Sequence, residues 1–68
     1  MAKPYKYADD NDDSPVLLGE TEAWTIAFEK WTRMDHTEAF ANARLLSKSD
    51  FEEMYPDLPP LPAEAFAD

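Results

Sequence analysis

The chain has 68 residues, a formal net charge of −9 at pH 7 and no cysteine. This length allows one small domain near the lower limit for a self-sufficient core, and the lack of cysteine excludes a disulfide framework and a thiolate metal site. The charge argues against nucleic acid or an anionic membrane as a direct partner, because phosphate groups repel it.

The first predicted segment, residues 1–15, is a disordered acidic arm. It contains Pro4 and Pro15 and shows no apolar periodicity. Such a segment cannot bury enough apolar surface to offset the entropy lost on ordering. Residues 16–68 are then expected to form a single small helical domain with a proline-rich tail.

Residues 9–20, DDNDDSPVLLGE, match part of a twelve-residue calcium-binding loop. The carboxylates and amide at positions 1, 3, 5 and 12 are Asp9, Asn11, Asp13 and Glu20. An EF-hand, however, needs glycine at position 6, where this chain has serine, and a helix before the loop, which Pro4 disfavours. We therefore expect no specific calcium binding and favour an acidic arm whose residues 16–18 fold onto the helical hairpin; specific calcium binding is the alternative.

Residues 21–34 are predicted to form the first helix. Its apolar side chains recur at helical spacing as Trp24, Ala27, Phe28, Trp31 and Met34. Thr21 is a suitable N-cap, and the acidic side chains near the start complement the helix dipole.

Two shorter helices are predicted at residues 36–46 and 50–55. Asp35 and Glu38 form a capping-box pattern before the first of them, and Ser49 with Glu52 repeats that pattern before the second. Because so few residues separate 21–34 from 36–46, these two helices are expected to form an antiparallel hairpin.

The tail that follows Pro56 is expected to be extended, because its sequence is PDLPPLP. Leu58 and Leu61 then lie on one face, and we expect them to pack back over Trp24 or Trp31. The alternative is that the PPLP stretch, residues 59–62, is a ligand motif of the kind that WW domains bind.

The predicted fold is therefore all-α: a helical hairpin, a short third helix, a tail packed across them and a disordered arm. The residues expected in its core are Trp24, Phe28, Trp31, Phe40, Leu46 and Phe51. A domain of this size cannot enclose all of these rings, so some aromatic surface is expected to remain for a partner.

Charge is distributed unevenly along the chain. Residues 9–22 and 49–68 each carry −6, whereas residues 23–48 carry +1. The favoured partner-binding residues are Asp50, Glu52, Glu53 and Asp57, because a helix and a proline hold them in place. The secondary set is the acidic arm, Asp9, Asp10, Asp12 and Asp13.

No catalytic pattern is present in the sequence. His36 is the only histidine, and no spacing supplies a nucleophile and an orienting group beside it. The chain has a single glycine, which excludes a glycine-rich phosphate-binding loop. We expect neither enzymatic activity nor a cofactor or metal.

The expected function is that of a small protein-binding inhibitor or regulator. Its expected partner is a larger protein with a basic surface, and proteins that bind nucleic acid are one class with such a surface. The comparison is with phage-encoded inhibitors and antitoxins of similar size and charge. The alternative is an assembly subunit that uses an exposed aromatic helical face, as a homodimer or in a larger complex. The longest apolar run spans only residues 16–18 and no signal peptide is evident, so a soluble, cytoplasmic protein is expected.

Overall fold

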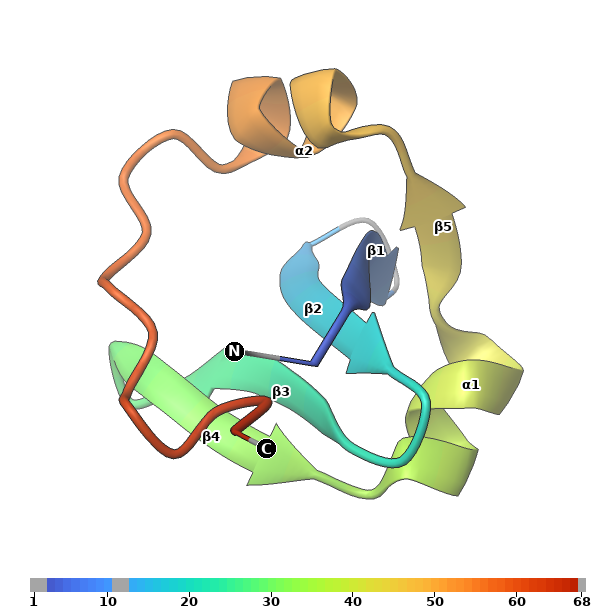
Figure 1. Ribbon diagram of the computed structural model, residues 1–68. Helices are drawn as coiled ribbons and strands as arrows, with labels where there is room; N and C mark the ends of the chain where they lie inside the picture. Colours follow the sequence, from blue (N-terminus) through green and yellow to red (C-terminus); the bar gives the residue numbers. More distant parts are fainter. Residues whose placement is uncertain (1–2, 11–12, 68) are drawn as a thin grey trace.

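The computed structural model describes residues 3–10 and 13–67 as a small β domain with two short helices. The elements are β1 (Tyr5–Asp10), β2 (Ser14–Gly19), β3 (Ala23–Ala27), β4 (Lys30–Met34), α1 (His36–Asn42), β5 (Arg44–Leu46) and α2 (Lys48–Met54). The strands form one antiparallel sheet in the order β4-β3-β2-β1-β5 (Figure 1). The all-α prediction is therefore wrong, and so is the predicted helical hairpin.

The predicted helix 21–34 is the hairpin of β3 and β4. Trp24 pairs with Arg33 and Ile26 pairs with Trp31, so both tryptophans lie on the same face of the sheet. The sequence of this stretch is rich in aromatic and β-branched residues, which favour strands. The same tryptophan spacing fits one face of a helix or two strands joined by a tight turn, and strand propensity decides between them.

The turn between β3 and β4 has an unusual composition. It contains two residues, Phe28 and Glu29, with positive φ angles of 54° and 65°. A two-residue hairpin turn of this kind normally contains asparagine and glycine, because side chains disfavour the left-handed conformation. The sequence therefore carries no recognisable turn signal here. Phe28, which was predicted to be in the core, is 93% exposed at the tip of this turn.

The N-terminal segment that was predicted to be disordered contains a central strand of the sheet. β1 lies between β2 and β5 and pairs with both. Tyr5 and Tyr7 alternate with exposed Lys6, and this period of two is the strand signal that the acidic composition hid. Asp9 is only 1% exposed, and the guanidinium of Arg44 on β5 lies 3.2 Å from its carboxylate.

The two helices are shorter than, or shifted from, their predicted bounds. α1 begins after the predicted N-cap Asp35, whose carboxylate accepts hydrogen bonds from the backbone of Thr37 and Glu38. It ends at Asn42 rather than at residue 46, because the chain then turns into β5. α2 is capped by Ser47 instead of Ser49 and ends before Tyr55.

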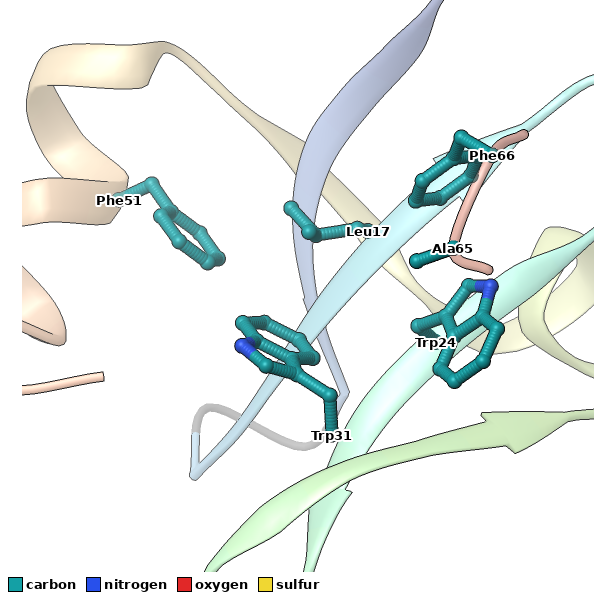
Figure 2. Close-up of a cluster of buried hydrophobic side chains, with 6 residues drawn as sticks. All are labelled: Leu17, Trp24, Trp31, Phe51, Ala65 and Phe66. Atoms are coloured by element: carbon teal, nitrogen blue, oxygen red, sulfur yellow. The ribbon is translucent and has the colours of Figure 1, made fainter. Parts of the chain in front are cut away.

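The sheet is covered on both faces. One face, here called the tryptophan face, packs against α2 and the C-terminal tail; its buried cluster consists of Leu17, Trp24, Trp31, Phe51, Ala65 and Phe66 (Figure 2). The other, the alanine face, packs against α1; its buried cluster consists of Ala8, Val16, Leu18, Ala23 and Ala39. The core predictions of Trp24, Trp31 and Phe51 are confirmed, and Leu46 packs partly buried against the same cluster. Phe40 was predicted to be buried but is 72% exposed on α1.

The C-terminal tail crosses the tryptophan face. The prediction that Leu58 and Leu61 pack back on the core is confirmed, since both are partly buried against the cluster that contains the tryptophans. The indole N–H of Trp31 donates a 2.7 Å hydrogen bond to the carbonyl of Pro59. The proline-rich stretch is therefore a part of the fold.

Glu22 holds the end of the tail. Its buried carboxylate accepts hydrogen bonds from the indole N–H of Trp24 at 2.8 Å and from the backbone N–H of Phe66 at 3.2 Å. The hydrogen bond from Trp24 lowers the pKa of Glu22, and this effect exceeds the opposing effect of burial. The carbonyl of Phe66 in turn accepts a hydrogen bond from the backbone of Lys3.

No helix in the described ranges is both long enough and apolar enough to cross a membrane.

Candidate functional site

The fold separates the ends of the stretch that resembles a calcium loop. Asp9 lies in β1 and is buried beside Arg44, whereas Gly19, which precedes Glu20, pairs with Tyr5 at the far end of the hairpin. Four residues of strand, about 13 Å, thus separate Asp9, the first position of the motif, from the level of Gly19, the residue before the last position. Within residues 3–10 and 13–67, no cluster of three potential metal ligands occurs.

His36 has a structural contact at the start of α1. Its Nε2 lies 2.8 Å from the carbonyl oxygen of Gly19, and because a carbonyl can only accept, the imidazole donates this hydrogen bond. The bond ties α1 to the end of β2. The ring also lies 6.1 Å from that of Phe40, measured between centroids.

The secondary acidic residues do not form one surface array. Asp9 is buried, Asp10 is half-buried, and Asp13 is exposed and accepts a hydrogen bond from the hydroxyl of Ser14. Asp12 lies outside the described residues. The part of this set that the structure describes is therefore divided between the sheet interior and the hairpin end.

The favoured acidic residues lie on and just after α2, and the side chains of Asp50, Glu52, Glu53 and Asp57 are all exposed. None of these four carboxylates forms an ion pair with another described residue. Glu52 and Glu53 are in the last turn of α2, which has no basic residue, and there the helix dipole disfavours negative charge. Glu52 and Glu53 therefore contribute little or nothing to the stability of the fold, whereas Asp50 lies in the first turn of α2, where the dipole favours its charge.

Helix geometry divides the four acidic residues into two groups. Asp50 and Glu53 are three residues apart and line one shallow groove between α2 and β5, of about 660 Å³. Glu52 is four residues from Lys48, so these two side chains are neighbours on the other flank of α2. The groove therefore brings together Asp50 and Glu53, and not the complete predicted set.

Large exposed apolar side chains flank the same edge of the sheet. Leu45 of β5 is 54% exposed and Met54 of α2 is 40% exposed, and both line the groove that contains Asp50 and Glu53. Leu45 also lines a second groove of about 500 Å³, together with Phe40 of α1. We call the set Phe40, Leu45, Asp50, Glu53 and Met54 the β5 edge surface.

The β5 edge surface is acidic although Arg44 borders it. The Nε and Nη2 atoms of Arg44 donate hydrogen bonds of 3.3 and 3.2 Å to the two carboxylate oxygens of Asp9. These two hydrogen bonds pair the positive charge of Arg44 with the negative charge of Asp9. Asp50 and Glu53 therefore leave a net negative charge on the surface beside Leu45 and Met54.

Sequence reasoning found the acidic half of this surface and missed the apolar half. The charges of Asp50 and Glu53 were recognisable without a structure, because no basic residue follows Lys48. Phe40 was predicted to be buried, and Leu45 was predicted to lie in a helix. The short edge strand that places Leu45 beside both helices carries no separate sequence signal.

Comparison of the chain with protein-family models, with curated proteins and with solved structures finds no match.

Proposed function

We propose that this chain is a small non-enzymatic binding protein whose β5 edge surface occupies a basic surface of a larger protein, as an inhibitor or regulator. The observation that carries the proposal is the position of Asp50 and Glu53: exposed, without a cationic partner in the described structure, and beside exposed Leu45 and Met54. A nucleic-acid-binding protein would provide such a basic surface.

The combination of charge and apolar contact supports binding better than either alone. Exposed carboxylates direct association towards a basic surface and away from nucleic acid. Apolar side chains at the centre of a contact supply most of its affinity once water is excluded. A cytoplasmic site of action is part of the proposal, and the absence of cysteine from the chain agrees with a reducing compartment.

A second candidate function is that of an assembly subunit held mainly by apolar contacts. The 72% exposure of Phe40 favours it, since an aromatic ring left in water suggests a partner for that ring. Salt separates the two candidates, because a charge-driven complex weakens with ionic strength and an apolar interface does not.

The test compares two double variants that each remove two negative charges. Asp50→Asn with Glu53→Gln neutralises the groove, whereas Glu29→Gln with Glu64→Gln neutralises two exposed carboxylates elsewhere. Host proteins retained by the immobilised wild-type chain at about 50 mM salt are identified by mass spectrometry, and the retained protein is then purified for titration calorimetry.

The proposal expects that neutralising the groove weakens binding of the purified partner at least tenfold, about 1.4 kcal/mol. The control variant should bind within a factor of about two of wild type, and wild-type affinity should fall between about 50 and 500 mM salt. Equal losses of affinity in the two variants would show that Asp50 and Glu53 contribute only through the net charge of the chain. Affinity that is insensitive to salt would instead favour the assembly subunit.

A further inference from the structure

We propose that the partner docks as an extended segment that pairs with β5 as an additional strand, and that basic and apolar side chains alternate along this segment. The inference rests on the proposed function, because it names how the basic partner would use the β5 edge surface. Three observations support it: an unpaired strand edge, different chemistry above and below that edge, and a poor match to a second copy of the chain.

β5 ends the sheet and has only one neighbour. It pairs with β1 through Leu46, Leu45 and Arg44, and no other described strand lies outside it (Figure 1). Alternate residues of a strand direct their backbone N–H and C=O groups to opposite sides. At least one residue of β5 therefore presents backbone groups that the sheet leaves unpaired, and such an edge is a template for another strand.

The opposite edge of the sheet is less suited to this role. β4 carries exposed Lys30 and Arg33 along its length, and charged side chains on an edge oppose further pairing. They would also repel a basic segment. β5 also carries a cation, Arg44, but its guanidinium is hydrogen-bonded to the carboxylate of Asp9. Leu45 lies at the centre of β5 and is flanked by Phe40 and Met54, so the apolar and acidic groups favour pairing at β5.

The two sides of the β5 edge differ chemically in a way that matches strand periodicity. On the side of α2 lie Asp50 and Glu53, and on the side of α1 lies Phe40, with Leu45 bordering both. Successive side chains of an added strand point to opposite sides of the sheet. A segment in which Lys or Arg alternates with Val, Ile or Leu would therefore place its charges against α2 and its apolar groups against α1.

A second copy of the chain fits this edge less well. It would bring another net charge of −9 and its own Asp50 and Glu53 to the contact. Like charges placed across an interface oppose association. The occupant that complements the edge is therefore a basic extended segment of a different protein.

The test uses a synthetic nonapeptide in which Lys and Val alternate, with blocked ends. Two derivatives carry N-methyl groups, one on the Lys residues only and the other on the Val residues only. In a strand all Lys N–H groups point to one side and all Val N–H groups to the other. With Lys towards α2 and the segment antiparallel to β5, one of these sets faces β5, so the derivative methylated on that set cannot pair in this way and the other can. Binding to the full chain is measured by two-dimensional amide NMR titration.

We expect the parent peptide to shift the amide signals of β5 and of its neighbours on α1 and α2. One N-methylated derivative should bind like the parent, and the other should bind at least about tenfold more weakly, because each lost hydrogen bond lowers the affinity severalfold. Neutralising Asp50 and Glu53 should weaken the parent peptide, whereas the Glu29 and Glu64 control should not.

Each contrary result shows which part of the proposal is wrong. If both derivatives bind like the parent but neutralisation of Asp50 and Glu53 weakens all three, the strand pairing is wrong and the acidic site stands. If neutralisation has no effect, the proposed function falls as well. No shift at about 1 mM peptide, or shifts located away from β5, overturns the inference. A wild-type dimer in sedimentation equilibrium that Leu45→Lys makes monomeric would assign the edge to a second copy.

Discussion

Replacement of Gly19 by alanine tests how the C-terminal tail is seated on the sheet. A Cβ atom at this position would lie 2.7 Å from Cε1 and 3.0 Å from Cδ1 of Phe66. The ring cannot retreat easily, because Phe66 is buried and stacks on Tyr5 with ring centroids 4.5 Å apart. The φ angle of Gly19 is not positive, so alanine suits the backbone and the cost is steric.

The size of the loss of stability should depend on Phe66. In the wild-type chain the steric conflict should cost about 1–3 kcal/mol, less the ~0.4–1 kcal/mol that alanine contributes by restricting the unfolded chain. Phe66→Ala should itself cost about 3–5 kcal/mol. In that background the contact with the ring is gone and only the 3.2 Å approach to the backbone oxygen of Glu22 remains, so Gly19→Ala should lower the free energy of unfolding by less than it does beside the ring.

Urea unfolding followed by circular dichroism measures this difference in all four proteins. Trimethylamine N-oxide in every sample strengthens burial and keeps the least stable variant folded at the start of the titration. If Gly19→Ala has the same cost with and without the Phe66 ring, the ring does not pack on Gly19. The position of the tail across the tryptophan face would then be wrong.

Two further predictions concern Glu22 and the turn between β3 and β4. Because the pKa of Glu22 is lowered in the folded chain, its contribution to stability is complete above its ordinary value of 4.5 and is lost as the pH falls through the lower folded-state value. Glu22→Gln should therefore lower the melting temperature at neutral pH, and the difference from wild type should shrink below pH 4.5; an unchanged difference contradicts this. Phe28→Asn with Glu29→Gly should raise the free energy of unfolding by about 1 kcal/mol, because it relieves two positive φ angles without losing burial. Loss of stability in chemical unfolding would show that the exposed ring contributes to the fold.

The β3–β4 hairpin explains why the fold class could not be predicted from the sequence. Trp24 and Trp31 have the spacing of a helical face, and the two strands that actually carry them are each only five residues long. Periodicity over such short stretches does not separate strand from helix. The turn would normally decide, but Phe28 and Glu29 take positive φ angles without the usual glycine or asparagine.

The N-terminal strand β1 was not predicted, because its acidic residues resemble those of a solvated, disordered segment. Asp9 has the appearance of a solvated residue in an acidic run, yet it is buried against a cation 35 residues away in the sequence. Such a pairing is a property of the sheet order and has no local signal. Local signals did work where the chemistry is local: the Asp35 cap was predicted correctly, and so was the packing of Leu58 and Leu61.

The composition of α1 links the fold to the proposed binding surface. The helix turns Ala39 towards the sheet, where the residue is buried against the alanine face, and leaves the ring of Phe40 72% exposed. Burial of a phenylalanine side chain is worth about 1.5–3 kcal/mol more than its exposure. Burying Ala39 and exposing Phe40 is therefore not the arrangement that maximises stability. At the position of Ala39 the helix packs directly on the small side chains of the alanine face, and Ala39 is 1% exposed there. Phe40, on the next position of the helix, lines one groove with Leu45, where an added strand would cover both.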